Sequence, residues 1–290
     1  MNFDLILTAR DRKIETLRFF ESLTTQQGAV SGRILFADQG LGLGQEPFNV
    51  LSNRSKISLE VREIPPSPLS TARNEAIKLG LRSQIVGFPD DDCWYGPTVL
   101  QSIQEVFEVD PEIQCVCTNV FDPIRGLSYG GRPVGIRIPI NFSNIFLLPI
   151  SVGIFMRREI FEAVGANFDE NLGAGTTIGS GEETELIARL LNLSAKILYV
   201  GDISVFHPVP EYETKDAQKY YSYGIGYGYL SVSLIWQGKY VVAKNLINTL
   251  IRSIVGCFVF FLVKTKRDVY WNRFAGILRG GFMAVKHLKM

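Results

Sequence analysis

Three consecutive aspartates, Asp90–Asp92, are the most distinctive chemical group in the sequence. They follow the short apolar run Gln84–Phe88, which predicts a buried strand, and no Lys or Arg stands within six residues downstream. Neighbouring carboxylates repel one another, and a divalent cation with oxygen ligands would relieve that repulsion. Alternate residues of the triplet can converge, so Asp90 and Asp92 are candidate metal ligands while Asp91 points elsewhere. The structural alternative is a solvated loop in which the third aspartate caps the following helix.

A second acidic group, Glu182 and Glu183, follows the stretch Gly173–Gly181, which has four glycines in nine residues. Flexible backbone before two carboxylates indicates a loop that orders over a ligand. The alternative is that the helix dipole favours glutamates in a first helical turn. His207 comes near the end of the last predicted strand, where it is either a structural histidine or part of the site.

Short apolar runs alternate with helical periodicity around these groups. Strands are predicted at 3–8, 33–38, 57–64, 84–88, 114–118, 151–157 and 195–200, helices at 12–24, 70–81 with Ser70 as N-cap, 158–164 and 186–191, and an irregular segment at 123–149. This order predicts an α/β fold with a Rossmann-like, mostly parallel central sheet and helices on both faces. Ligands of such sheets bind beyond the carboxyl ends of the strands, where Asp38, the aspartate triplet and Asp122 fall.

Composition excludes several classes of protein. The chain has 290 residues, is 46% hydrophobic and carries a net charge of +1, which argues against a disordered chain and against whole-protein nucleic-acid binding. Four cysteines make no disulfide framework, and two histidines give no basis for a structural zinc site. The N-terminus has no signal-peptide pattern, so a cytoplasmic location is expected.

The charge is unevenly distributed. Residues 239–290 hold ten Lys or Arg and one acid, a charge of +9, which leaves −8 for residues 1–238. The same tail contains the uncharged run Ser253–Val263, eleven residues long against the roughly 20 that cross a bilayer. An apolar, basic helix on an anionic membrane surface is therefore expected. A packing helix or a dimer interface is the alternative, and the aromatic run Tyr220–Tyr229 suits either sugar or lipid contact or plain helix packing.

The order of these motifs resembles the family 2 glycosyltransferases of the GT-A fold. The matching pieces are Thr8-Ala9-Arg10, Asp38, Leu69–Asn74, Phe88–Asp92, Gly179–Glu183 and His207. The resemblance covers about residues 1–210, and the tail also looks like those of bacterial polysaccharide-assembly members. It implies a catalytic domain at 1–212 and a helical, membrane-associating region at 213–290.

The resemblance also implies roles for individual residues. Thr8, Ala9, Arg10, Asp38, Arg73, Asp90 and Asp91 would bind the donor, and Asp90, Asp92 and His207 would bind Mn²⁺ or Mg²⁺. Glu183 would be the catalytic base. Because aspartate is commoner at that position in the family, Glu182 is the fallback.

The implied reaction is metal-dependent, inverting transfer of one sugar from a nucleotide-diphosphate donor. UDP is the family's commonest nucleotide, and the acceptor would be a hydroxyl of a saccharide or lipid-linked oligosaccharide at the inner face of the cell membrane, in cell-surface polysaccharide synthesis. A non-catalytic nucleotide-sugar-binding or scaffold protein is the main alternative. A nucleotidyltransferase is disfavoured because no glycine-rich loop follows the first strand, and a processive synthase would need several transmembrane spans, of which the sequence predicts none.

Overall fold

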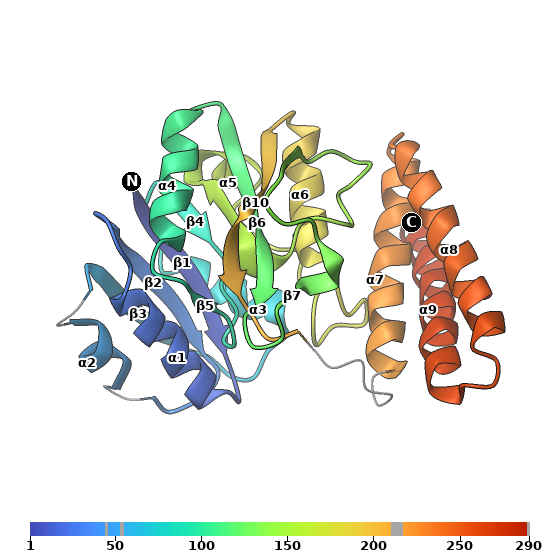
Figure 1. Cartoon of the computed structure of the whole chain (residues 1–290), viewed down its shortest axis with the longest axis horizontal. Helices are drawn as coiled ribbons and strands as arrows, with labels where there is room; N and C mark the ends of the chain where they lie inside the picture. The colour runs from blue at the N-terminus through green and yellow to red at the C-terminus, as the bar shows by residue number, and fades with distance from the viewer. Residues whose placement is uncertain (44–45, 53–54, 210–216, 289–290) are drawn as a thin grey trace. The chain divides into compact units, whose positions relative to one another are not determined.

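The computed structural model describes residues 1–43, 46–52, 55–209 and 217–288 (Figure 1). The chain divides into two compact units. The first comprises Met1–Asn141, Leu147–Phe168 and Leu186–Val209, and the second comprises Phe142–Phe146, Asp169–Glu185 and Pro210–Met290. The second unit therefore includes two segments from the middle of the sequence besides the basic tail.

The first unit is built on one mixed sheet. Its strands are β1 (Asn2–Ala9), β2 (Ser31–Asp38), β3 (Ile57–Glu63), β4 (Ile85–Gly87), β5 (Trp94–Tyr95), β6 (Ile113–Asp122), β7 (Leu127–Ser128), β8 (Arg137–Pro139), β9 (Ile154–Arg157) and β10 (Lys196–Phe206). The strand order is β3-β2-β1-β4-β9-β6-β10-β5, with β7 paired to β6 and β8 to β10. The pairs among β3, β2, β1 and β4 are parallel, as is β6 with β10, whereas β9 is antiparallel to both of its neighbours.

Helices flank this sheet (Figure 1). They are α1 (Lys13–Thr24), α2 (Glu46–Ser52), α3 (Leu69–Ile77), α4 (Val99–Val109), α5 (Arg158–Ala163) and α6 (Glu182–Asn192), with 3₁₀ turns at Tyr129–Gly131 and Ser151–Gly153. The predicted α/β class with a central sheet and flanking helices is confirmed. The predicted Ser70 cap is wrong: Pro68 takes the N-cap position of α3, and Ser70 is buried within the first turn. Proline suits a helix start because it has no backbone N–H to leave unpaired.

Strand composition explains the central position of β1. Seven of its eight residues are buried, so both faces of the strand are covered, as expected for a central parallel strand. Phe3 packs edge to face on Phe155 of β9, at 6.4 Å between ring centroids. The buried carboxylate of Asp4 accepts hydrogen bonds from Ser83 and pairs with Arg33, so its charge is compensated inside the sheet.

Strand register places the candidate residues at one edge of the sheet. Ala9, the last residue of β1, is level with Asp38, the last of β2, and β4 runs parallel to β1 on its other side. The chain leaving β4 therefore carries the aspartate triplet to the edge where Asp38 lies. β10 is parallel to β6, with Phe206 level with Phe121, so His207 and Asp122 leave the sheet together.

The second unit contains three long helices: α7 (Ala217–Trp236), α8 (Val241–Val259) and α9 (Lys264–Leu288). Helices α7 and α9 approach closely because glycines line both sides of their contact. A Cβ at Gly224 would lie 2.6 Å from the carbonyl oxygen of Arg273, and Cβ atoms at Gly228 and Gly280 would overlap carbonyl oxygens of the facing helix. Any larger side chain at these three positions would force the helices apart.

Among the described helices, α8 is long and apolar enough to cross a membrane, judged by length and composition alone. Its mean hydropathy is 1.3, and 17% of the stretch is buried. The expectation that no segment reaches spanning length is therefore wrong by this criterion. The helix begins at Val241, well before the uncharged run at Ser253, and continues through Lys244 and Arg252.

Candidate active site

Two aspartates and a histidine converge in the first unit. Ligand atoms of Asp90, Asp92 and His207 all lie within 4.8 Å of one another. The aspartates follow β4 and the histidine follows β10, so residues more than a hundred positions apart meet where two parallel strands end. These are the three residues that the sequence analysis named as candidate metal ligands. Asp92 does not cap the next helix, because α4 begins at Val99 with Thr98 at its N-cap position.

The imidazole of His207 is held in one orientation. Its Nδ1 lies 2.7 Å from the carbonyl oxygen of Pro208, which can only accept, so Nδ1 carries the proton. Its Nε2 lies 2.9 Å from Oδ1 of Asp92. A histidine that donates one ring N–H to a backbone carbonyl and turns the other nitrogen toward carboxylates is arranged like a typical metal ligand.

Arginines from distant helices balance the aspartates. Arg73 of α3 is fully buried, and its Nη2 lies 2.7 Å from Oδ1 of Asp90. Arg12, at the N-cap of α1, pairs with Asp92 and, at 3.2 Å, with Oδ1 of Asp91. These two guanidinium groups pair with all three carboxylates, and His207 lies against Asp92 as well.

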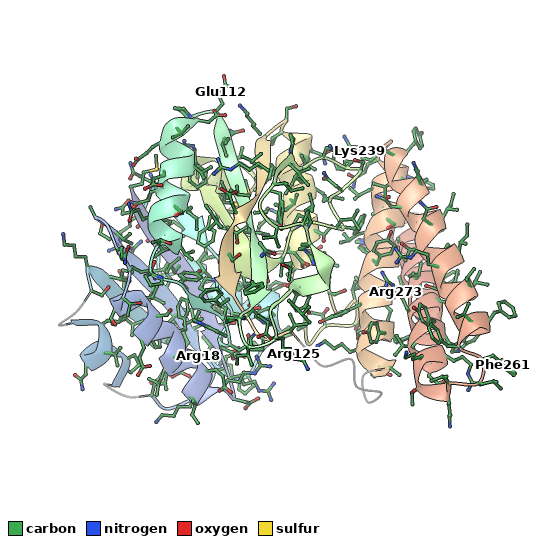
Figure 2. The ribbon with its side chains drawn as sticks, viewed as in Figure 1. Arg18, Glu112, Arg125, Lys239, Phe261 and Arg273 are labelled. Atoms are coloured by element: carbon green, nitrogen blue, oxygen red, sulfur yellow. The ribbon has the colours of Figure 1, made fainter. Side chains whose placement is uncertain are left out.

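Arg18 of α1, which is labelled in Figure 2, supports the backbone of the triplet. It donates a hydrogen bond of 2.7 Å to the carbonyl oxygen of Asp92 and lies 3.9 Å from the centre of the Trp94 ring. Sequence reasoning missed Arg12 and Arg18 as partners of the triplet. The only signal was the basic character of the chain after β1, since α1 itself is ordinary in its periodicity.

The pKa values of the group reflect both its burial and its neighbouring charges. Burial is the main cause that raises the pKa of Asp91 to about 6; Arg12 opposes the rise, and Asp92 and Asp90 add to it. Burial also opposes ionisation of Asp92, but His207 and Arg12 outweigh it and lower the pKa of Asp92. Burial alone would lower the pKa of His207, yet its hydrogen bond to Asp92 and the nearby negative charges raise it. The lowered pKa of Asp92 and the raised pKa of His207 both show that this pair favours the ionised carboxylate beside a positive charge.

Asp122 fixes the chain segment that carries the histidine. Its Oδ2 accepts a hydrogen bond of 2.9 Å from the amide of Val209, and its Oδ1 accepts bonds from the amides of Ile124 and Arg125. The amide of His207 donates to the carbonyl of the residue before Asp122, at 3.0 Å. Burial opposes ionisation of Asp122, but these amides outweigh it and lower the pKa of Asp122. Asp122 thus positions the histidine rather than joining the ligand group.

The residues predicted to bind the donor lie along the same sheet edge. Thr8 and Ala9 are buried at the end of β1, and Arg10 is exposed beside Asp11. Asp38 is buried, and its Oδ1 accepts hydrogen bonds from the amides of Gly40 and Leu41, so it also caps its own turn. Arg73, from the predicted motif Leu69–Asn74, is buried and pairs with Asp90. Thr8, Ala9 and Asp38 therefore lie at one edge of the sheet.

The two glutamates begin α6 in the second unit. Glu182 is buried, at 6% exposure, and Glu183 is half-buried. The glycine-rich loop before them is internally hydrogen-bonded: the Thr176 hydroxyl donates to the Gly173 carbonyl and accepts from the Gly179 amide. Its glycines 173, 175, 179 and 181 all have positive φ. Left-handed backbone therefore accounts for the glycine content of this loop.

No protein-family profile and no curated protein matches the chain by sequence. Similar solved structures are glycosyltransferases of GT-A-like fold. TarS from S. aureus matches with a TM-score of 0.57 and 14% identity over 78% of this chain, which spans only 39% of the TarS chain. TarS 1–349 in complex with UDP-GlcNAc matches with a TM-score of 0.56 and 14% identity, covering 78% of this chain and 66% of that one.

The mannosyltransferase PcManGT from Pyrobaculum calidifontis, in complex with GDP-Man and Mn²⁺, matches over a larger share of its own length than TarS does. The TM-score is 0.63 at 11% identity, covering 96% of this chain and 86% of that one. At such low identity these matches establish the fold. The chain therefore has the fold of GT-A-like glycosyltransferases, as the motif order predicted.

Proposed function

We propose that this chain is a metal-dependent glycosyltransferase that moves one sugar from a nucleotide-diphosphate donor to an acceptor hydroxyl. The observation that carries the proposal is the convergence of Asp90, Asp92 and His207 at the carboxyl ends of strands in this fold. Similar structures with bound UDP-GlcNAc, or with GDP-Man and Mn²⁺, support a nucleotide-sugar donor.

The residues at the site fit a divalent cation. Two carboxylates and an imidazole form a donor set suited to Mn²⁺, and the backbone hydrogen bond of His207 fixes the ring so that Nε2 faces the carboxylates. Asp90, Asp92 and His207 would hold the ion. When bound, Mn²⁺ or Mg²⁺ supplies positive charge that stabilises the diphosphate leaving group.

The donor would lie along the sheet edge formed by β1, β2 and β4. In this proposal Asp38 binds the nucleoside, and Thr8, Ala9 and Arg10 line its pocket. Asp90 and Asp91 face the donor from the next strand, and Arg73 keeps Asp90 in place from the core. Ligands of parallel α/β sheets bind at this edge, which supports the assignment.

Glu183 would act as general base. It takes the proton of the acceptor hydroxyl while that oxygen attacks the anomeric carbon, and the bond from that carbon to the diphosphate oxygen breaks on the opposite face. A single displacement inverts the configuration, so an α-linked donor gives a β-linked product. Glu182 is more deeply buried than Glu183, which supports the second glutamate as the group that reaches substrate. The loop 173–181 would cover the reactants and exclude water.

The acceptor would be a saccharide or a lipid-linked oligosaccharide used in cell-surface polysaccharide synthesis. The basic, apolar tail supports an acceptor presented at a membrane, with the enzyme in the cytoplasm at its inner face. UDP is the first donor nucleotide to test, followed by GDP.

Calorimetric titration with UDP, GDP, CDP and dTDP, each with Mn²⁺ and with EDTA, tests the donor site without knowledge of the acceptor. We expect one nucleotide to bind only when Mn²⁺ is present. Nucleotide binding without hydrolysis or transfer of any matching nucleotide-sugar would instead indicate a non-catalytic binding protein. Failure of all four nucleotides to bind would refute the proposal.

A further inference from the structure

In the three helices of the second unit, large apolar side chains lie on the outward faces and small or polar residues lie at the helix contacts. Helix α8 packs inward with Val242, Ser253 and Gly256, while its large apolar residues face outward. In a water-exposed helix the outward face is normally polar. Along α8, the exposed apolar residues recur at helical spacing on the side opposite the buried one: Ile247, Ile251, Ile254, Val255 and Phe258.

The inward faces of these helices carry small and polar groups. A Cβ at Gly276 of α9 would lie 3.0 Å from Cα of Gly224 on α7, so the two backbones nearly touch there. The Tyr227 hydroxyl lies 3.1 Å from the Thr249 hydroxyl, which joins α7 to α8. Small residues at these contacts let the backbones approach closely and leave the large apolar side chains for the outward faces.

The turn between α8 and α9 extends the outward apolar face (Phe261 in Figure 2). Phe258 is 76% exposed, Phe261 63% and Leu262 92%. Lys264 and Lys266 follow at once and are exposed. Helix α9 repeats the pattern, with outward Trp271, Leu278 and Phe282, spaced at multiples of the helical turn. Exposed apolar residues next to lysines and a tryptophan are typical of protein segments at the bilayer interface. There the apolar side chains enter the lipid and the lysine amines reach the headgroups.

From this arrangement we infer that the exposed apolar face of α8, together with the α8–α9 turn, inserts into the surface of an anionic lipid bilayer, with α8 lying in the membrane plane. A surface between two copies of the chain would be depleted of lysine at its centre. Here Lys244 and Arg252 stand on α8 itself and are exposed, and residues 239–290 carry a charge of +9. Positive charge of this density complements anionic headgroups.

The position of Arg252 favours an in-plane helix over a spanning one. If α8 crossed the bilayer, this residue would lie near the centre of the nineteen-residue helix and therefore of the hydrocarbon layer. A charged side chain there is costly. In the membrane plane, the same side chain lies at the flank of the apolar stripe and can reach the headgroups while the isoleucines face the acyl chains.

Flotation of the full chain with lipid vesicles tests the inference without nucleotide or acceptor, so it succeeds or fails independently of the proposed transferase activity. We expect binding to vesicles of phosphatidylcholine with 30% phosphatidylglycerol to be about tenfold or more tighter than to phosphatidylcholine alone. Substituting Lys264→Gln and Lys266→Gln together should remove about tenfold of that binding, and salt should weaken the binding of the unmodified chain.

The triple variant Phe258→Ser, Phe261→Ser and Leu262→Ser should bind these vesicles about 100-fold more weakly, because three exposed apolar side chains no longer enter lipid. The matched control is Val109→Ser with Ile124→Ser, which removes equally exposed apolar residues of the first unit and should leave binding unchanged. Circular dichroism and thermal unfolding check that each variant is folded.

Four results would overturn the inference. Equal binding to neutral and anionic vesicles would refute the role of the basic residues, and undiminished binding of the triple variant would refute insertion of the turn. Resistance of the bound chain to extraction by alkaline carbonate would show that α8 spans the membrane. Sedimentation of a stable dimer that ignores vesicles would assign the apolar face to a second copy of the chain.

Discussion

Replacing Asp92 by asparagine isolates the charge of the candidate metal site. Oδ1 of this aspartate lies 2.9 Å from Nε2 of His207, and its other oxygen pairs with Arg12. Asparagine keeps the shape and one acceptor oxygen but removes the negative charge. We therefore expect Asp92→Asn to keep the fold and to lose most of the cation affinity.

The size of the effect follows from the spacing of the ligand atoms. They lie within 4.8 Å of one another, so a bound cation would lie closer than that to each carboxylate. At an effective dielectric constant of about 20, two unit charges about 4 Å apart interact by about 4 kcal/mol. The amide oxygen retains part of this, and a net loss of about 3 kcal/mol corresponds to affinity weakened by about 100-fold.

The assay is calorimetric titration of Mn²⁺ alone, and of each nucleotide diphosphate with Mn²⁺ or EDTA, into both forms of the protein. Asp110→Asn is the matched control, because Asp110 lies at the opposite end of β6 and pairs with Lys196. It makes the same chemical change outside the site and should bind as the unmodified chain does. If Asp92→Asn binds Mn²⁺ within threefold of the unmodified chain, the ligand assignment is refuted.

The remaining predictions concern the base, the core and the second unit. Glu183→Gln should lower kcat by about 10²–10⁴-fold and leave nucleotide affinity unchanged, and a parallel loss of both would argue for a structural role instead. Arg73→Met should lower the free energy of unfolding by about 3 kcal/mol in a denaturant titration, because the ionised Asp90 loses its buried partner. Gly280→Ala should destabilise the protein by about 1–3 kcal/mol because its Cβ overlaps a carbonyl of α7, whereas Gly281→Ala, with 3.3 Å to its nearest neighbour, should be tolerated; equal melting temperatures of the two variants would contradict the close helix contact.

Local patterns were sufficient to predict the parallel part of the sheet. β1, β2 and β3 were predicted as strands, with a helix between the first two, whereas the short helix α2 between β2 and β3 was not predicted. The direction of β9 was not predictable in this way. Ile154–Arg157 is an ordinary apolar run, and its antiparallel place between β4 and β6 depends on the long irregular segment that precedes it.

In the candidate site, too, local features were predictable from the sequence and contacts between distant residues were not. Asp90 and Asp92 were predictable because their identity, spacing and place after a strand are local properties. Their counter-charges were not, since Arg12 is 80 positions from Asp92 and belongs to a helix that looks ordinary by itself. The helix α8 illustrates a third case: the apolar run from Ser253 was evident, but the helix begins earlier because lysine and arginine are both good helix formers.

Charge balance explains why a locally repulsive triplet can be part of a stable fold. Arg73 and Arg12 compensate two of the three charges from opposite sides, one within the core and one at the start of α1. Burial is the main cause that raises the pKa of Asp91 to about 6, and the charges of Asp92 and Asp90 add to the rise while Arg12 opposes it. A third arginine bound to these carboxylates would compete with a cation for the same oxygens. Perturbed pKa values that gather where parallel strands end are typical of binding sites, which agrees with the proposed cation site.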